Sequence, residues 1–394
     1  MTVILFDDQF RTNLLPFTFT RPVSDIRIGI LTIAEKWGLY FKTTPFYLTE
    51  EYLQEKYPFS SGSVNMLING SICPDGELME AMDKLREGDA LVLGDILIAV
   101  KLACSEAVEF NFKKIEEYHK SEYSGKLLKI SYPEDIFRKN GHELIKDFDL
   151  LTQGRSSIAI SSSNTIIGDN IFIEEGATAE CASFNSTQGP IYLGRNSQVW
   201  EGSHIRGSFA LCEESIVKMG AKIYGMTTIG PHSKAGGEIN NSVIFGNSAK
   251  GHDGYLGNSV VGEWCNFGAG SNNSNMKNNY AEVKLWDYSN DNFRRTGLQF
   301  CGLIMGDHSK CGINTMFNTG TVVGVSANVF GPGFPRHFIP DFAWGGYQGF
   351  ETYSLNKMFE TAEKVFERKN IVFGEMDKKL LTQVFELSNK YRKF

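Results

Sequence analysis

The sequence predicts an α/β domain over residues 1–152, a parallel β-helix over residues 153–331 and a helical extension over residues 332–394. Three observations support this division. Strand and helix signals alternate in the first part of the chain, apolar residues recur at every sixth position in the middle, and the apolar spacing becomes helical near the C-terminus. A chain of 394 residues is too long for one ordinary core, so we expect more than one structural unit.

The first domain is predicted from short apolar runs that alternate with amphipathic segments. The run VILF near the N-terminus and the apolar runs at residues 66–68 and 90–100 indicate strands, and residues 76–85 have the apolar spacing of a helix. Residues 132–155 are expected to form a connecting helix. This alternation is typical of layered α/β domains.

The middle of the chain carries a hexapeptide repeat. Eight positions in steps of six are apolar, and the residue four places later is nearly always small, with Phe209 as an exception. Each hexapeptide can form a short strand with its apolar residue inward, so three hexapeptides complete one coil of a parallel β-helix. A β-sandwich fits less well, because its strands repeat with a period of two. The apolar positions are Leu193, Val199, Ile205, Leu211, Val217, Ile223, Ile229 and Ala235.

The hexapeptide repeat is broken at two places and then gives way to helical spacing. The positions Ile244, Lys250 and Leu256 keep the spacing, although Lys250 is charged, and a polar loop at 271–297 interrupts the coils. Long loops that leave a regular solenoid are usually functional or form interaction arms. Residues 355–366 and 380–387 then have helical apolar spacing, so we expect two C-terminal helices that cap the open end or pack on a neighbour.

The composition narrows the expected partners. The formal net charge of −7 argues against nucleic acid or an anionic membrane as the main partner. The chain contains no apolar run as long as a membrane span, and its start, MTVILFDDQFR, lacks the basic residues and cleavage site of a signal peptide. We therefore expect a cytoplasmic protein. Because the histidines are irregularly spaced, we do not expect a histidine metal site.

The stretch KGHDGYLGNSVVGEWCNFGAGSNNSN, at residues 250–275, resembles the acetyltransferase site of a bifunctional family of N-acetylglucosamine-1-phosphate uridyltransferases and glucosamine-1-phosphate acetyltransferases. The resemblance spans nearly the whole chain and is closest to the compact form of Bacteroidetes-type bacteria, through TFTRPVSDIRIGILTIAEKW, IFRKNGHELIKDFDLLTQGR and GINTMFNTGTVVGVSANVF. It implies a sugar nucleotidyltransferase-like domain followed by a left-handed β-helix that uses acetyl-CoA.

The resemblance also implies roles for particular residues of the repeat. The family pattern GHxxYxG places the general base at His252 and a substrate-binding tyrosine at Tyr255. The pattern NxGAG adds Asn266 as a substrate contact and Ala269 as a backbone contact to acetyl-CoA. The sugar-binding asparagine that follows GAG corresponds to Asn275.

The basic residues of the family site correspond less directly. Lys218, within KMGAK, is the expected counterpart of the residue that holds the sugar phosphate, after a short gap in the alignment. Another family lysine, twelve residues before the histidine, is Asn240 here. Either Lys250 or Lys222 could replace that charge.

The residues themselves also fit acyl transfer to an amine. A histidine with a pKa near neutrality can remove the proton of an amine as it attacks a thioester. Glycine-flanked backbone N–H groups, as in GAG, can approach the tetrahedral oxyanion closely. Asparagines offer donors and acceptors for sugar hydroxyls. The other corner histidines, His204, His232 and His308, are expected to be structural.

The start of the first domain departs from the family's nucleotide-binding signature. A pyrophosphorylase normally begins with a glycine-rich loop that holds the nucleotide phosphates. Here residues 4–22 contain no glycine, and Asp7 and Asp8 would repel phosphates unless a metal intervenes. Arg11 and Arg21 match the remaining signature, so these two residues are expected to bind the nucleotide.

The aspartate that would hold Mg²⁺ has two alternative positions in the alignment. One alignment supplies Asp95 from LVLGDILIA, and the other places Ser71, from INGSICPD, where the aspartate belongs. In the second case the magnesium ligand is missing. The first domain is then either an active nucleotidyltransferase or a degenerate, regulatory domain.

Three functions follow from these observations. The leading interpretation is a sugar-phosphate N-acetyltransferase that uses acetyl-CoA and acts on glucosamine-1-phosphate, with a first domain that forms UDP-N-acetylglucosamine from UTP. One alternative is a nucleotidyltransferase whose β-helix only oligomerises or regulates, and another is a non-catalytic scaffold that binds sugar nucleotides. Because flat solenoid faces pack by threefold symmetry, we expect a homotrimer with the coenzyme between neighbours.

Overall fold

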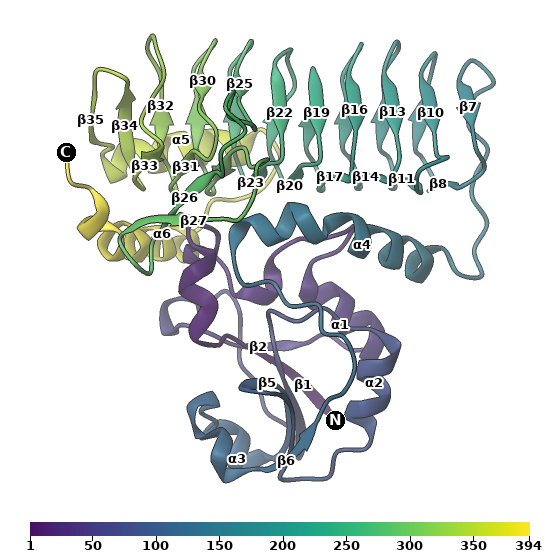
Figure 1. Cartoon of the computed structure of the whole chain (residues 1–394), viewed down its shortest axis with the longest axis vertical. Coiled ribbons are helices and arrows are strands. Elements are labelled where there is room, and N and C mark those ends of the chain that lie inside the picture. The colour runs from purple at the N-terminus through teal and green to yellow at the C-terminus, as the bar shows by residue number, and fades with distance from the viewer. The chain divides into compact units, whose positions relative to one another are not determined.

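The computed structural model describes residues 1–394, which form two compact units (Figure 1). The first unit comprises Met1–Leu14, Thr20–Ile26 and Leu31–Ser131, and the second comprises Leu15–Phe19, Arg27–Ile30 and Tyr132–Phe394. The predicted combination of an α/β domain, a parallel β-helix and C-terminal helices is confirmed. The domain boundaries at residues 152 and 331 stay predictions.

The first unit is built on a six-stranded mixed sheet with the order β2-β1-β3-β5-β4-β6. The central strand β1 is parallel to β2 and β3, while β5 runs antiparallel to β3 and β4. Apolar side chains of these strands form a buried core that includes Ile4, Phe6 and Leu67. The strands are β1 (Thr2–Phe6), β2 (Phe46–Leu48), β3 (Val64–Asn69), β4 (Asp89–Leu93), β5 (Ile96–Ala103) and β6 (His119–Glu122).

The helices of the first unit follow their sequence signals. Helix α1 begins with a capping box, in which the Thr32 hydroxyl accepts from the Glu35 N–H and the Glu35 carboxylate accepts from the Thr32 N–H. The apolar run at 90–100, expected as one segment, forms two antiparallel strands because Gly94 takes a left-handed turn, with φ of 56°. The helices are α1 (Ile33–Phe41), α2 (Gly76–Asp83) and α3 (Cys104–Val108), with 3₁₀ turns at Gln9–Leu14, Val23–Asp25, Glu51–Leu53 and Phe112–Glu117.

The second unit is a β-helix whose strands line up in three parallel sheets, one on each side of the coil (Figure 1). One sheet contains β7 (Thr165–Ile167), β10 (Ser183–Asn185), β13 (His204–Arg206), β16 (Lys222–Tyr224), β19 (Glu238–Asn240) and β22 (Tyr255–Gly257), and beyond it lies the pair β25 (Asn272–Asn273) and β30 (Met316–Phe317). The second contains β8 (Ile171–Ile173), β11 (Ile191–Leu193), β14 (Phe209–Leu211), β17 (Thr227–Ile229), β20 (Val243–Gly246), β23 (Val260–Glu263), β28 (Ile304–Met305), β31 (Val322–Val323) and β33 (Phe338–Ile339). The third contains β9 (Thr178–Ala179), β12 (Gln198–Val199), β15 (Ile216–Val217), β18 (Lys234–Ala235), β21 (Ala249–Lys250), β24 (Asn266–Phe267), β29 (Lys310–Cys311), β32 (Asn328–Val329), β34 (Ala343–Gly346) and the antiparallel β35 (Gly349–Thr352).

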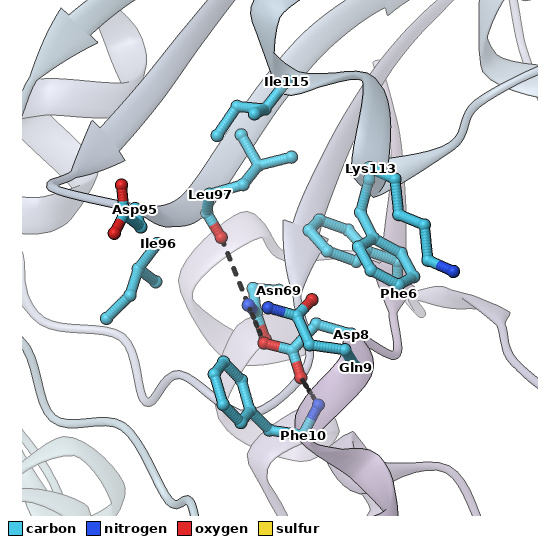
Figure 2. A pocket seen from close by; sticks show the side chains of 11 residues that line it. Phe6, Asp8, Gln9, Phe10, Asn69, Asp95, Ile96, Leu97, Lys113 and Ile115 are labelled. Carbon is cyan, nitrogen blue, oxygen red and sulfur yellow. Dashed lines mark hydrogen bonds between the residues drawn. The ribbon is translucent and has the colours of Figure 1, made fainter.

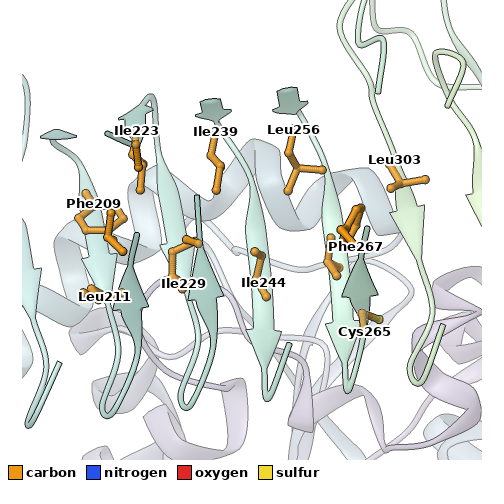
Figure 3. Close-up of a cluster of buried hydrophobic side chains, with 14 of the residues drawn as sticks. Phe209, Leu211, Ile223, Ile229, Ile239, Ile244, Leu256, Cys265, Phe267 and Leu303 are labelled. Atoms are coloured by element: carbon orange, nitrogen blue, oxygen red, sulfur yellow. The ribbon is translucent and has the colours of Figure 1, made fainter. Parts of the chain in front are cut away.

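The apolar residues of the hexapeptide repeat fill the axis of the β-helix. Figure 3 shows Ile223, Ile239 and Leu256 from successive coils stacked in one row, with Ile229 and Ile244 in another. These side chains are almost completely buried. The stacking explains the six-residue spacing, because only a residue at that interval returns to the axis of the coil.

The small residues of the repeat complete the corners between sheets. At regular corners the last residue, just before the next strand, carries a hydroxyl. This hydroxyl donates to the carbonyl of the first residue of the corresponding corner in the next coil. Ser203 donates in this way to Lys218, at 3.0 Å, and Ser271 to Gly312, at 3.0 Å. The same bond joins Ser215 to Gly230, at 2.8 Å. A hydroxyl at this position therefore donates to a buried carbonyl that receives no hydrogen bond from the pairing of parallel strands.

The C-terminal part continues and then covers the solenoid. The parallel pairing extends past residue 331, since β33 pairs with β31 and β34 with β32. Phe366 of α5 stacks on Trp264, with ring centroids 3.8 Å apart, so α5 packs along the side of the coils. None of the helices of this protein combines the length and apolar content that crossing a membrane requires. The helices of the second unit are α4 (Pro133–Thr152), α5 (Leu355–Glu367) and α6 (Glu375–Leu387), with 3₁₀ turns at Phe17–Phe19 and Asn389–Tyr391, and the loop at 271–297 contains the hairpin of β26 (Lys284–Asp287) and β27 (Asn292–Arg295).

The axial core supplies a stability test. Ile229 is fully buried, so Ile229→Ala should destabilise the protein by about 2–5 kcal/mol through lost burial and a cavity. Ile313→Ala, at a corner residue that is 73% exposed, is the control and should have little effect. Urea denaturation followed by circular dichroism measures both variants. Equal destabilisation of the two would contradict the assigned axis.

Candidate functional site

The backbone ladder of the β-helix opens at one place, between β22 and β25. These neighbouring strands belong to different sheets and exchange no backbone ladder bonds. Side chains bridge them instead, because the Asn272 side-chain oxygen accepts from the Tyr255 N–H at 2.7 Å, and Asn273 bonds to both the N–H and the carbonyl of Gly257, at 2.9 and 3.1 Å. Asparagine side chains thus replace the backbone ladder on this face of the solenoid beside the GHDGY segment.

Two of the predicted sugar-binding residues meet at this opening. The Asn275 amide donates to the Tyr255 hydroxyl at 2.8 Å and to the Asn258 side-chain oxygen at 2.7 Å. Burial raises the pKa of Tyr255, so its hydroxyl stays protonated at neutral pH. The group offers several neutral donors and acceptors, which is the chemistry that sugar hydroxyls require.

A carboxylate beside this group was missed by sequence reasoning. Glu238 is the neighbour of Tyr255 in the sheet, and its carboxylate accepts from the Tyr224 hydroxyl at 2.6 Å. This hydrogen bond raises the pKa of Tyr224 to about 12. Asn240 lies in the same strand, paired with Tyr224 and Gly257. The sheet face next to Tyr255 therefore carries the Glu238 carboxylate, and the position where the family resemblance implies a lysine is the neutral Asn240. The signal available in the sequence was the outward position of Glu238 in the repeat.

His252 lies on an exposed corner that leads into the same strand. The four residues from Gly251 to Gly254 join β21 to β22, and the His252 ring is exposed and makes no hydrogen bond within the chain. The following corner contains Ala269, which is also exposed and whose carbonyl accepts from the Asn314 N–H at 2.7 Å. An exposed imidazole next to a polar opening is free to contact a substrate.

The basic residues nearest to this corner come from the preceding coils. The Lys218 side chain packs beside Gly251, since a Cβ on that glycine would lie 3.7 Å from both Lys218 Cγ and Lys234 Cβ. The Lys218 ammonium lies 3.3 Å from the centre of the Trp200 ring. Desolvation, followed by repulsion from Lys234, lowers the pKa of Lys218. The methylene groups of two lysine side chains therefore pack against the backbone of the His252 corner.

The structure corrects the suggestion that Lys250 supplies the missing charge to a ligand. Lys250 is 2% exposed, and its ammonium donates to backbone carbonyls inside the coil, so it does not reach a ligand. Lys222 is exposed and lies next to Glu238 in the sheet. Asn266 is exposed on β24, in the third sheet, where it pairs with Ala249 and Lys310, and it has no contact with the Tyr255 and Asn275 group.

The first unit has a polar cluster at the carboxyl ends of its parallel strands. Asp8 follows β1, and its carboxylate accepts from the Asn69 amide at 2.9 Å and lies 3.2 Å from the Lys129 ammonium. Figure 2 shows Asp8 and Asn69 side by side on the wall of a cavity of about 310 Å³, which Asp95 and Lys113 also line. Open α/β sheets bind ligands at this edge.

The two predicted nucleotide-binding arginines are held inside the first unit. Arg11 lies 3.3 Å from the Asp7 carboxylate and donates to the Tyr52 hydroxyl at 2.9 Å. Arg21 lies 3.5 Å from the Asp25 carboxylate. Both side chains are less than 10% exposed. The structure thus separates Arg21 from the cavity that Asp95 lines, while Arg11 borders a neighbouring cavity with Asp7 and Asp8.

The residues around this cavity do not offer a ready Mg²⁺ site. Asp8 already has the Lys129 ammonium as its cation, and Ser71 is buried with its hydroxyl bonded to Asn69 at 2.6 Å. Asp95 is exposed in the turn between β4 and β5. No cluster of three or more carboxylate, histidine or cysteine side chains in the chain could hold a metal ion. We therefore derive no catalytic step from Mg²⁺.

Comparison with known proteins finds similarity to transferases. Residues 3–156 match the family model described as sugar nucleotidyl transferase. The bifunctional protein GlmU of Methanocaldococcus jannaschii is 36% identical over 87 residues, which cover 22% of this chain and 21% of that protein. The bifunctional protein GlmU of Methanococcus maripaludis is 28% identical over 213 residues, which cover 54% of this chain and 45% of that protein. The chain thus spans less than half the length of these curated relatives.

A solved structure, that of the Arabidopsis UDP-N-acetylglucosamine acyltransferase, matches with 15% identity and a TM-score of 0.26. The match covers 59% of this chain and 93% of that chain. The fold assignment rests on the strand pairing described above.

The buried Asp7 generates a pH prediction. Desolvation raises its pKa to about 6, against opposing effects of Arg11, Thr49 and the Val23 N–H and a reinforcing effect of Asp8. Between pH 4 and pH 6, Asp7 ionises in the unfolded chain but remains protonated in the folded one. Stability should therefore fall as the pH rises through this window, by on the order of 3 kcal/mol for this group.

Asp7→Asn should remove this part of the pH dependence. Urea denaturation at pH 4, 5, 6 and 7 measures the difference between wild type and variant. Asp95→Asn, which changes an exposed carboxylate of the same domain, is the control and should keep the wild-type slope. A wild-type slope in Asp7→Asn would contradict the assignment.

Proposed function

We propose, from the similarity of this chain to bifunctional GlmU proteins, that its β-helix transfers the acetyl group of acetyl-CoA to the amine of a sugar phosphate. The observation that carries the proposal is the exposed His252 corner, which leads directly into the strand of Tyr255 and lies beside the opening between β22 and β25. Glucosamine-1-phosphate is the proposed acceptor.

In the proposed reaction His252 acts as the general base. It accepts a proton from the sugar amine as the nitrogen attacks the thioester carbonyl, and the coenzyme leaves as a thiolate that is then protonated. The transfer is direct, so no side chain needs to become acylated. The backbone N–H group of Ala269 is proposed to face the acetyl group and the oxyanion.

The polar groups around the corner divide the task of substrate binding. The Tyr255, Asn275 and Asn258 group fits neutral hydroxyls, because each member carries both donor and acceptor capacity. Glu238 fits the positive charge of an amine before deprotonation or a hydroxyl donor. Lys218 and Lys234 are the proposed contacts for an anionic phosphate. Asn266 remains a proposed contact from the third sheet.

A second activity is proposed for the first unit, namely nucleotidyl transfer from UTP to the acetylated sugar phosphate. The match of residues 3–156 to the sugar nucleotidyl transferase model favours it, together with the cavity at the carboxyl ends of β1 and β3. Arg11 and Asp95, which border the neighbouring cavities, are the proposed nucleotide contacts, and Arg21 is proposed to hold the fold of that region. A homotrimer in the cytoplasm is also proposed, on the resemblance and the flat sheets of the solenoid.

Replacement of the base tests the acetyl transfer. His252→Ala should lower the rate of thiol release from acetyl-CoA with glucosamine-1-phosphate by about 10²–10⁴-fold, because the amine loses its proton acceptor. His204→Ala, which changes an exposed histidine on β13, in the sheet that contains β22, is the matched control and should retain wild-type activity. Wild-type activity in His252→Ala would exclude the histidine as the base.

The two activities should be separable in the same chain. With UTP, Mg²⁺ and N-acetylglucosamine-1-phosphate, wild type and His252→Ala should release pyrophosphate at equal rates, because the acetylated sugar bypasses the β-helix. Pyrophosphate is followed by a coupled phosphate assay, separately from free thiol. Absence of pyrophosphate from both proteins would identify the first unit as a binding or regulatory domain.

A further inference from the structure

Lys250 occupies an inward position of the β-helix. Its neighbours along the axis are Ala235 in the preceding coil and Phe267 in the following one, and both are buried and apolar. The Lys250 ammonium donates to the Gly236 carbonyl at 3.0 Å and to the His252 carbonyl at 2.5 Å. A lysine in the axial core thus connects two successive corners, one of which carries the proposed base.

The Gly236 carbonyl needs this donor because the usual one is missing. At regular corners a hydroxyl in the preceding coil bonds the first carbonyl of the next corner, as Ser203 does for Lys218 and Ser271 for Gly312. The residue that would serve Gly236 is Ala221, which has no hydroxyl. Lys250 supplies the missing bond from the opposite side.

The His252 carbonyl needs the donor because the backbone hydrogen bond between its corner and the next one is shifted by one residue. At the regular corners the carbonyl of the second residue accepts from an N–H of the next coil, as Glu201 does from Gly220 and Ala269 from Asn314. Here the Gly270 N–H bonds the Asp253 carbonyl, one residue further on, at 3.1 Å. The His252 carbonyl thus receives no backbone hydrogen bond from the next coil, and it points inward to the Lys250 ammonium.

We propose that Lys250 is a positioning residue that fixes the backbone of His252, and with it the direction of the imidazole toward the amine of the substrate. This inference rests on the proposed acetyl transfer. A buried carbonyl without a partner is unfavourable, so without the ammonium the corner would relax toward the regular register or toward water. Either change moves the ring, and a shift of about 1 Å in a reacting group can lower a rate by about a hundredfold.

The burial of a charged lysine has its own cost. Desolvation lowers the pKa of Lys250 to about 8, and Asp253 opposes this effect. An apolar residue at this inward position would avoid that cost, and the other coils use one. Lys250 must therefore do something that an apolar side chain cannot do, and donating hydrogen bonds to two carbonyls meets this requirement.

The experiment compares three variants of the full chain. Lys250→Met keeps the length and packing of the side chain but removes both donors. Ala221→Ser combined with Lys250→Met restores a hydroxyl for the Gly236 carbonyl only. Lys310→Met is the matched control, because the Lys310 ammonium also donates to the carbonyl of a histidine, His308, at 2.8 Å, and burial also lowers its pKa to about 8.

Lys250→Met should lower kcat for acetyl transfer by about ten- to a hundredfold, with less than about a twofold change in KM for acetyl-CoA. The double variant should regain thermal stability but not kcat, because the His252 carbonyl still lacks its donor. Lys310→Met should keep kcat within about twofold of wild type. Amide hydrogen exchange at residues 251–255 should accelerate in both Lys250 variants and not in Lys310→Met.

Two results would overturn the inference. Unchanged kcat and exchange in Lys250→Met would show that the lysine does not hold the corner. Recovery of kcat in the double variant would assign the effect to the Gly236 carbonyl and to stability alone. If the wild type releases no thiol, the proposed acetyl transfer fails, and the exchange data still decide whether Lys250 fixes the corner.

Discussion

The constraint on which the β-helix depends is that each coil must satisfy the backbone groups that its neighbour leaves over. Parallel strands do this along the sheets, and corner hydroxyls such as Ser203 and Ser271 do it between them. The six-residue repeat reflects this constraint, because every hexapeptide must supply an inward apolar residue and a small corner residue. Any coil that breaks the pattern needs another donor, and the place where it does so is informative.

The breaks in this chain gather around one corner. The hydroxyl absent at Ala221, the shifted bond to Asp253 and the side-chain bridges of Asn272 and Asn273 all lie within two coils of His252. A regular solenoid offers a closed polar ladder with little to bind. By giving up regular pairing there, the chain exposes an imidazole next to hydroxyl, amide and carboxylate groups. The rest of the repeat then serves as a rigid support, which is the arrangement that a precise acyl transfer requires.

The sequence predicted the regular parts well and the irregular parts poorly, for one physical reason. Residues such as Ile223 and Ile239 reveal their place through spacing alone, because every inward position has the same environment. The family resemblance indicated Tyr255 and Asn275 as sugar-binding residues, and the structure brings them together. The buried ammonium of Lys250 did not, because its partners are backbone carbonyls that have no sequence signature. Likewise, the pairing of Asp8 with Lys129 depends on chain folding across distant segments.

The central claim is that His252 meets the amine of the acceptor at the opening between β22 and β25. The most direct measurement is a crystal structure of the full chain with coenzyme A and glucosamine-1-phosphate, in which the distance from the imidazole to the sugar nitrogen is read. This account predicts about 3 Å, with the sugar hydroxyls on Tyr255 and Asn275. A sugar phosphate bound on another face, with His252 still in solvent, would contradict it.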